Sequence, residues 1–314
     1  MEQPRTVLVT TRSFGSGDAD PAEQLRRAGL EVVHGDPDHR LPDLAEHLPR
    51  CVAWIAGVGP VTADHLAAAP GLRIVARYGA GVDAVDLVAA RARGIRVTNT
   101  PGANARSVAE HTVALLLATL RHVASGDREV RAGRWPTRRG REVGALTVGL
   151  VGFGRVGEEV GGLLVCFGAE VLAHDPGREP GEIREVGVRP STLDELLTAA
   201  EVVSLHRPPG ERSLVDAGFL ARLRPGAILL NTARAALVDP DAVAIALEEG
   251  RLSAYGDDVT CPAPEDRLAG APNTVFTPHL GAATTEAIDR MGSIAAEEVL
   301  RTLRGEPALH PVTP

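Results

Sequence analysis

Hydrophobic residues along the chain gather in short runs that alternate with amphipathic segments. Apolar runs of about four to eight residues favour buried strands, and apolar positions that recur every three or four residues favour helices. The predicted strands are residues 6–10, 31–34, 51–56, 72–78, 95–98, 146–151, 170–173, 202–205, 227–231, 253–258 and 274–277. The predicted helices are residues 21–28, 41–48, 62–68, 87–93, 107–120, 192–198, 219–223, 241–249 and 284–303, with one more directly after Gly157. This alternation predicts parallel β-α-β units.

The segment 107–120 predicts a long and strongly apolar helix. Ser107 and Glu110 have the spacing of a capping box, with Ser107 as the N-cap. A helix this apolar must be covered on most sides, so it is a candidate for the join between domains or for a subunit interface. Residues 121–142, which follow it, are polar and basic with one large apolar residue, Trp135. They lie either on a partner subunit or on the surface.

A glycine-rich turn follows the apolar strand 146–151, and the chain is organised around it. Gly152, Gly154 and Gly157 form a Gly-x-Gly-x-x-Gly sequence that leads into a helix and then a second strand, which ends in Asp175. These glycines permit a tight turn, a close approach of the backbone to a pyrophosphate, and close packing of helix on strand. The helix N-terminus offers N–H groups to phosphates. The pattern predicts a dinucleotide site.

The acidic residue at the end of the second strand indicates which dinucleotide would bind. Asp175 can accept hydrogen bonds from both hydroxyls of an adenosine ribose and would repel a 2′-phosphate, which favours NAD over NADP. Arg178 lies just beyond it and could instead face a phosphate, so this preference stays open. The alternative for the whole motif is a glycine-rich turn without a ligand.

The length of 314 residues suits two domains. We expect an α/β fold with two doubly wound parallel-sheet domains, of which the nucleotide-binding one is Rossmann-type, and a cleft between them. Residues 1–99 and 285–314 are predicted to form a discontinuous substrate-binding domain, because the last helix is expected to return to the first domain. Residues 100–284 are predicted to form the NAD-binding domain.

The composition is typical of a globular protein without nucleic-acid or membrane partners. Hydrophobic residues make up 44% and charged residues 24%, and the net charge of -8 comes without a basic run. No apolar run is long enough to cross a membrane, and from the polar N-terminus we expect no signal peptide. The three cysteines, Cys51, Cys166 and Cys261, stand far apart, which predicts reduced thiols in a cytoplasmic protein and no metal site.

Five further motifs, in their order along the chain, give a specific resemblance. They are Arg77-Tyr78-Gly79-Ala80-Gly81-Val82-Asp83, Asn99-Thr100-Pro101-Gly102-Ala103-Asn104, Ser107-Val108-Ala109-Glu110-His111, Asn231-Thr232-Ala233-Arg234 and Thr277-Pro278-His279-Leu280-Gly281. With the glycine turn, they resemble the D-isomer-specific 2-hydroxyacid dehydrogenases, a family that includes D-3-phosphoglycerate dehydrogenase, glyoxylate reductase and formate dehydrogenase. The resemblance implies an NAD-dependent oxidoreductase that interconverts a 2-keto acid and a D-2-hydroxy acid, and a homodimer.

Two residues at predicted strand ends carry the implied chemistry. In the family, the arginine at Arg234 binds the substrate carboxylate, and a planar two-pronged donor suits that task. The histidine at His279 is the family's acid/base, and imidazole can exchange a proton near neutral pH. The alternatives are a structural ion pair of Arg234 with Asp239 or Asp258, and a histidine that merely caps a turn.

The resemblance implies further contacts on both sides of the reaction. The substrate would contact the turn at Gly79, Ala80 and Gly81, with Tyr78, Asn104 and Arg234. The cofactor would contact the glycine turn with Arg155 and Val156, Asp175, the loop His206-Arg207-Pro208, and Thr232, Ala233, Arg234, Asp258, His279 and Gly281. Arg207 is unusual because the family mostly has an apolar residue there.

One departure from the family lies at Ala263, where family members usually have a glutamate that hydrogen-bonds the catalytic histidine. A nearby carboxylate favours the protonated form of a histidine, so its loss favours the neutral form. Three hypotheses follow. Glu265, predicted as catalytic, or Asp266 reaches back from a loop stiffened by two prolines; or His279 works unaided; or the protein binds NAD(H) as a weakly catalytic or non-catalytic redox sensor or partner-binding protein.

The loop Gly57-Val58-Gly59-Pro60 matches the place where family members contact the far end of the substrate. Phosphoglycerate-type members tend to have a cation there, and this loop has none. Tyr78 could narrow the pocket, and Arg106, Arg138 or Arg139 could supply a cation from elsewhere. The sequence therefore favours a small or apolar 2-keto acid over a phosphorylated one.

Overall fold

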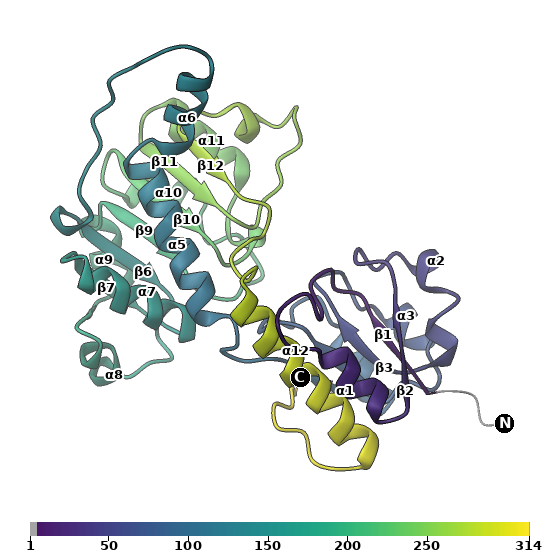
Figure 1. Cartoon of the computed structure of the whole chain (residues 1–314). Helices are drawn as coiled ribbons and strands as arrows, with labels where there is room; N and C mark the ends of the chain where they lie inside the picture. Colours follow the sequence, from purple (N-terminus) through teal and green to yellow (C-terminus); the bar gives the residue numbers. More distant parts are fainter. Residues whose placement is uncertain (1–4, 314) are drawn as a thin grey trace. The chain divides into compact units, whose positions relative to one another are not determined.

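The computed structural model describes residues 5–313, and the chain divides into two compact units. The first unit contains the described residues up to Asn104 and those from Ala282 onward, and the second is Ala105–Gly281. Each unit contains its own parallel sheet with helices on both faces (Figure 1). The domain boundaries predicted at residues 99 and 285, and the substrate-binding role of the first unit, stay predictions.

The sheet of the first unit has five parallel strands in the order β2-β1-β3-β4-β5. They are β1 (Arg5–Val9), β2 (Leu30–His34), β3 (Cys51–Ala56), β4 (Ile74–Arg77) and β5 (Arg96–Thr98). One apolar cluster joins the sheet to α1 (Pro21–Arg27) and α12 (Thr285–Arg304). The second cluster joins it to α2 (Leu41–Leu44), α3 (Ala63–Ala67) and α4 (Leu87–Ala92). Because α12 packs on β4, the end of the chain belongs to the first sheet.

The sheet of the second unit has seven parallel strands in the order β12-β11-β10-β9-β6-β7-β8. They are β6 (Thr147–Val151), β7 (Glu170–His174), β8 (Arg189–Pro190), β9 (Val202–Leu205), β10 (Ala227–Asn231), β11 (Leu252–Asp257) and β12 (Thr274–Phe276). One face packs on α5 (Ala105–Leu120), α7 (Arg155–Cys166) and α8 (Pro180–Glu185), and the other on α9 (Leu193–Ala199), α10 (Ala217–Arg222) and α11 (Pro240–Glu248). The strand order reverses between β6 and β9, which is the Rossmann arrangement.

Two local predictions were wrong. The apolar helix begins at Ala105, so Ser107 lies inside its first turn and is not the N-cap; a turn at residues 101–104 leads directly into the helix. The predicted helix 41–48 ends at Leu44, and a separate 3-10 turn covers Leu48–Arg50. Pro49 has no N–H to donate to the carbonyl of Ala45, and its ring would clash with that carbonyl in a continuous helix, which explains the break after Leu44.

The basic segment after α5 contains one helix that the sequence did not predict, α6 (Val123–Arg131). It has no buried residue, and Trp135 beyond it is 86% exposed. Three further 3-10 turns complete the second unit: Val143–Ala145, Ala235–Leu237 and Arg267–Gly270.

Candidate active site

The glycine turn lies at the point where the order of the second sheet reverses. Gly152 follows β6 and His206 follows β9, and these two strands are neighbours. Gly152 has a φ of +99°, and a Cβ there would lie 2.5 Å from the carbonyl oxygen of His206. Glycine is therefore required where the two strands diverge, and ligands of such sheets bind at this edge.

The other two glycines have different surroundings. A Cβ at Gly157 would lie 2.4 Å from the carbonyl oxygen of Gly152, so this glycine allows α7 to pack against the turn. A Cβ at Gly154, the residue before α7, would meet nothing within 4 Å. Open space beside Gly154, together with the N–H groups of Arg155 and Val156 in the first turn of α7, fits the pyrophosphate of a dinucleotide.

Asp175 follows β7 and closes the glycine turn. Its carboxylate accepts hydrogen bonds from the backbone N–H of Phe153, at 2.7 Å, and of Gly177, at 2.8 Å. A carboxylate has further lone pairs that could accept ribose hydroxyls. Arg178 is engaged nearby, because its guanidinium pairs with Glu158 on α7 and with Glu182 on α8.

His206 lies beneath the glycine turn, and the Oγ of Ser204 is 2.8 Å from its Nε2. Burial lowers the pKa of His206 to about 4, so the imidazole is neutral at pH 7. Arg207 and Pro208, which follow it, are exposed.

Arg234 lies in a turn at the carboxyl end of β10. Asn231 shapes this turn, since its side-chain nitrogen donates to the carbonyl of Arg234 at 2.9 Å and its side-chain oxygen accepts from the N–H of Ala233 at 3.1 Å. Nη1 of Arg234 donates to the carbonyl of Ala233. Thr232 is buried, with its hydroxyl 2.8 Å from that of Thr112 on α5.

Asp258, directly after β11, organises the loop that contains His279. Its side chain is 2% exposed. Oδ1 accepts from the hydroxyl of Thr277 at 2.6 Å and from the N–H of Leu280 at 2.8 Å, and Oδ2 accepts from the N–H of Gly281 at 2.8 Å. One carboxylate therefore fixes both sides of His279.

The backbone of His279 is held in an unusual conformation. Its N–H donates to the carbonyl of Asp258 at 2.8 Å, and its φ is +56°. Positive φ is uncommon for residues other than glycine and is often found where a side chain has a functional orientation. His279 itself is exposed, so the buried carboxylate presents an accessible imidazole at the sheet edge.

His111 on α5 completes the contacts of Asp258 and was assigned no role from the sequence. Its Nε2 lies 3.1 Å from Oδ1 of Asp258 and 2.9 Å from the hydroxyl of Thr277. Because that hydroxyl donates its hydrogen to Asp258, Nε2 of His111 must carry the hydrogen. Burial would raise the pKa of Asp258, but hydrogen bonds from His111, Thr277 and two backbone N–H groups outweigh it, and the pKa lies below its usual value.

Asp257 is a second buried carboxylate that the sequence analysis missed. It accepts from the N–H groups of Val259 and Thr260, both at 2.6 Å, and from the hydroxyl of Tyr255. It therefore anchors the start of the loop that contains Ala263. The available signal was a predicted strand that ends in two adjacent acids, of which only the second had been used.

At Ala263 the chain makes a tight turn in place of a carboxylate. The N–H of Ala263 donates to the carboxylate of Asp266 at 2.7 Å, and the N–H of Asp266 donates back to the carbonyl of Ala263 at 2.9 Å. Glu265 is exposed and, among residues 5–313, makes no hydrogen bond or ion pair.

Apart from Arg234, the predicted substrate contacts lie in the first unit: four of them directly follow β4, and Asn104 directly precedes α5. Tyr78 is buried, and its hydroxyl donates to the carbonyl of Ile288 at 3.2 Å. Gly79 has a φ of +135°, and its N–H donates to Thr100 at 3.0 Å. Ala80 is exposed, whereas Gly81 and Asn104 are half-buried. The structure brings Arg234, His279 and Asp258 together with the glycine turn on one sheet edge; contact of the first-unit residues with them stays a prediction.

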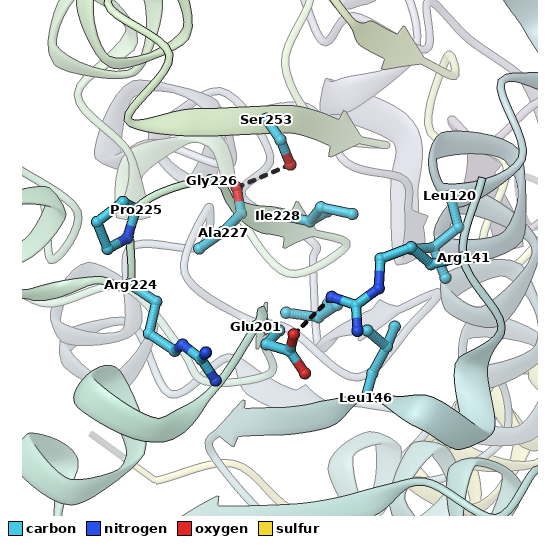
Figure 2. Close-up of a pocket in the computed structure, with 11 residues that line it drawn as sticks. Leu120, Arg141, Leu146, Glu201, Arg224, Pro225, Gly226, Ala227, Ile228 and Ser253 are labelled. Carbon is cyan, nitrogen blue, oxygen red and sulfur yellow. Dashed lines mark hydrogen bonds and ion pairs between the residues drawn. The ribbon is translucent and has the colours of Figure 1, made fainter. Parts of the chain in front are cut away.

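A cavity of about 120 Å³ lies at the opposite, amino-terminal edge of the second sheet (Figure 2). It is lined by residues at the starts of β9, β10 and β11, and Arg141 pairs there with Glu201. Because it lies at the far end of the strands from Gly152, it is separate from the candidate active site.

Comparison with known proteins agrees with this geometry. The family model described as "D-isomer specific 2-hydroxyacid dehydrogenase, NAD binding domain" matches residues 113–281. The D-3-phosphoglycerate dehydrogenase of Mycobacterium leprae is 44% identical over 252 residues, which are 78% of this chain and 48% of that protein. The chain belongs to the D-isomer-specific 2-hydroxyacid dehydrogenase family.

Other similar proteins match over more of their own length. The hydroxypyruvate reductase of Thermotoga maritima is 36% identical over 77% of this chain and 81% of that protein. The crystal structure of the TT0316 protein from Thermus thermophilus has a TM-score of 0.88 and 38% identity, and the match covers 98% of this chain and 100% of that one. By contrast, the chain spans about half the length of the D-3-phosphoglycerate dehydrogenase it matches.

The family model identifies the second unit as the NAD-binding domain, so the cofactor predicted from the glycine turn is confirmed. None of the helices within residues 5–313 is long and apolar enough to span a bilayer. The same residues contain no cluster of three or more histidine, cysteine or acidic side chains that could hold a metal ion.

Proposed function

We propose that this protein is an NAD-dependent oxidoreductase that interconverts a 2-keto acid and a D-2-hydroxy acid. The observation that carries the proposal is the loop that Asp258 holds around His279, at the same sheet edge as Arg234 and Gly152. A pure nucleotide-binding domain needs the glycine turn but neither the guanidinium nor an imidazole presented by a buried carboxylate.

Reduction of a 2-keto acid requires two tasks from the side chains: binding the carboxylate and donating a proton. Bound NADH supplies a hydride to the ketone carbon. Arg234 would hold the neighbouring carboxylate through a two-pronged hydrogen bond, and protonated His279 would deliver its proton to the ketone oxygen as negative charge develops there. In the oxidation direction, neutral His279 would take the hydroxyl proton. The backbone N–H groups of Ala80 and Gly81, with Asn104 and Tyr78, would complete the substrate contacts. The N–H of Gly79 already donates to Thr100, so Gly79 would contribute the turn and not a hydrogen bond.

The same proposal assigns the cofactor contacts. Arg155 and Val156 would meet the pyrophosphate and Asp175 the adenosine ribose. His206, Arg207 and Pro208 would lie under the cofactor, and Thr232, Ala233, Asp258 and Gly281 would surround the nicotinamide. The pairing of Arg178 with Glu158 and Glu182 supports NAD over NADP, because two carboxylates already oppose its charge.

Three hypotheses address the missing glutamate at Ala263. The exposure of Glu265 and the use of Asp266 inside its own turn support the hypothesis that His279 works without a carboxylate partner. A catalytic role for Glu265 requires that it move when substrate binds. A non-catalytic NAD(H)-binding sensor is the second candidate function, and the alanine at 263 is the observation that favours it.

The proposed substrate is a small or apolar 2-keto acid. The loop Gly57–Pro60, proposed to face the far end of the substrate, contains no cation, and its largest side chain, Val58, is 62% exposed. Arg12, which also follows a strand at this edge of the first sheet, is paired with Asp38. A phosphate group would therefore find no unopposed cation on this loop.

NADH oxidation with a panel of 2-keto acids tests the function. We expect turnover of glyoxylate, pyruvate or hydroxypyruvate, and weaker turnover of 3-phosphohydroxypyruvate. Tight NADH binding without oxidation at any pH would instead support the sensor.

We further propose that the protein is a cytoplasmic homodimer without nucleic-acid or membrane partners. The exposed Trp135 and the exposed helix α6 support a subunit contact there. Sedimentation velocity of the wild type and Trp135→Ser tests the proposal, with a dimer expected for the first and dissociation for the second.

A further inference from the structure

A buried histidine that the proposed reaction does not use lies in the first unit. His39, in the loop after β2, is 1% exposed and has a φ of +58°. A buried polar ring in left-handed backbone is costly unless its hydrogen bonds are satisfied. Both ring nitrogens of His39 have partners, and those partners determine which nitrogen carries the hydrogen.

The hydrogen bonds form a chain with one direction. Nε1 of Trp54 can only donate, and it donates to the hydroxyl of Thr10 at 2.8 Å. The N–H of Gly57 also donates to this hydroxyl, at 3.4 Å, so both of its lone pairs are used. The hydroxyl therefore gives its own hydrogen to Nε2 of His39, which is 2.6 Å away. Nδ1 of His39 lies 3.1 Å from the carbonyl of Pro60, which can only accept. His39 is therefore neutral, with its hydrogen on Nδ1.

A second buried histidine holds the backbone of the first. Nδ1 of His65, on α3, accepts the N–H of Thr62 at 3.2 Å, so its hydrogen is on Nε2. Nε2 lies 2.8 Å from the carbonyl of His39 and donates to it. The two histidines are thus opposite tautomers, and each is neutral.

The ring of His39 also fills space that a side chain of the next loop would need. A Cβ on Gly59 would lie 2.5 Å from Cγ of His39, and the ring packs against Trp54 with centroids 5.0 Å apart. His39 therefore holds the loop Gly57–Pro60 at two points, through the carbonyl of Pro60 and through the surface of Gly59. We refer to Thr10, His39, Trp54 and Pro60 as the His39 latch.

The His39 latch lies at the point where the order of the first sheet reverses. Thr10 follows β1 and Gly57 follows β3, and these neighbouring strands mark the reversal in the order β2-β1-β3-β4-β5. Ligands of open parallel sheets bind at the carboxyl ends of strands near this point. The loop fixed by His39 is therefore the one from which the first unit would contact a ligand.

We propose that His39 is a positioning residue for substrate selection: by holding the loop Gly57–Pro60, it places Val58 and so determines which 2-keto acid side chains are accepted. This inference rests on the proposed function, in which that loop faces the far end of the substrate. His39 does not contact reacting atoms, so it should affect long substrates and not glyoxylate, which has no side chain.

The charges around the ring support a neutral latch. Arg77 at the end of β4 faces it, and its positive charge disfavours a protonated His39. Asp36, on the same loop, is engaged by the backbone N–H and guanidinium of Arg40, and Asp38 by Arg12. Burial, more than these charges, lowers the pKa of His39.

Two substitutions separate the two ends of the latch. In His39→Asn, the amide nitrogen can replace Nδ1 and still donate to Pro60, and asparagine tolerates positive φ. In His39→Gln, the longer amide can reach Thr10 but leaves the carbonyl of Pro60 without its donor. The matched control is His34→Gln, at an exposed histidine on β2.

The kinetic test compares glyoxylate with 2-ketobutyrate. For His39→Gln we expect KM for 2-ketobutyrate to rise about three- to tenfold, the effect of one lost hydrogen bond, with kcat and the glyoxylate parameters within about twofold. His39→Asn and His34→Gln should resemble the wild type. An equal loss for both substrates would indicate a merely structural role and would overturn the proposal.

Two further measurements test the latch without relying on enzyme activity. Long-range 1H–15N NMR of the wild type at pH 7 should show His39 with its hydrogen on Nδ1. Amide exchange at Gly57, Val58, Gly59 and Val61 should be faster in His39→Gln but not in His39→Asn. The latch would be contradicted by a charged His39, by the other tautomer of its ring, or by amide exchange in His39→Gln that is the same as in the wild type. If the latch is seen but no 2-keto acid is reduced, the proposed function has failed and substrate selection by His39 fails with it.

Discussion

The carboxyl edges of the two sheets are organised by opposite kinds of buried group. In the second unit, the ionised carboxylate of Asp258 accepts four hydrogen bonds and holds the loop around His279. In the first unit, the neutral imidazole of His39 donates to one loop and accepts from the end of a strand. A carboxylate collects several donors at one point, whereas an imidazole links two groups on opposite sides. The first arrangement suits a fixed catalytic loop and the second a loop whose position sets specificity.

The largest expected effect is that of Asp258→Asn. The amide would place a donor against an N–H or hydroxyl donor, so the loop around His279 should move. We expect kcat/KM for 2-keto acid reduction to fall about 100-fold or more, with a loss of stability of roughly 2–3 kcal/mol. The exposed Asp64→Asn is the control for a lost aspartate charge. Near-normal activity in Asp258→Asn would show that the carboxylate is not needed to hold the loop around His279.

The glycine turn allows a matched pair of substitutions. Gly157→Ala should destabilise the second unit by about 2 kcal/mol or more, because its Cβ would meet the Gly152 carbonyl at 2.4 Å. Gly154→Ala should fold normally but bind NADH about tenfold more weakly, because the methyl enters the open side of the turn. Thermal unfolding and NADH titration distinguish the two; equal NADH affinity in Gly154→Ala and wild type would contradict the assignment of the phosphate site.

Lowering the pH should reduce the free energy of unfolding, because the carboxyl edges of both sheets contain histidines that the folded protein holds neutral. Burial lowers the pKa of His206 to about 4, whereas an unfolded histidine titrates near 6.5. Neutral His206 therefore contributes its full stability above about pH 6.5, and this is lost as the pH falls toward 4, because the unfolded chain takes up the proton first. The contribution is at most roughly 3 kcal/mol. Urea unfolding across this range should show a shallower decline in His206→Asn; identical slopes would contradict a ring that the folded protein holds neutral.

The smallest effect is expected at Glu265. Because its side chain is exposed and makes no hydrogen bond or ion pair in the described part of the chain, Glu265→Gln should change kcat/KM by less than about twofold at any pH. A pH–rate profile displaced in this variant, compared with Glu286→Gln on α12 as a control, would show instead that Glu265 reaches the active site during turnover.

The same comparison explains how much the sequence could predict. The turn from β6 through Gly157 to Asp175 is local, so its spacing alone predicted strand, turn, helix and acid. The roles of His111 and His39 could not be predicted, because the partners of these rings, Thr277 and Thr10, are distant in the sequence. Helix α6 was missed because its sequence is polar on average and none of its residues is buried, so it has too few apolar residues to stand out from a surface loop.

The most direct test of the account is NADH oxidation by His279→Asn, with NADH affinity measured on the same protein. We predict that reduction of a 2-keto acid falls by about 100- to 10,000-fold, the contribution of a positioned acid/base, while NADH binds as in the wild type. Wild-type turnover by this variant would contradict the claim that the loop held by Asp258 presents the proton donor.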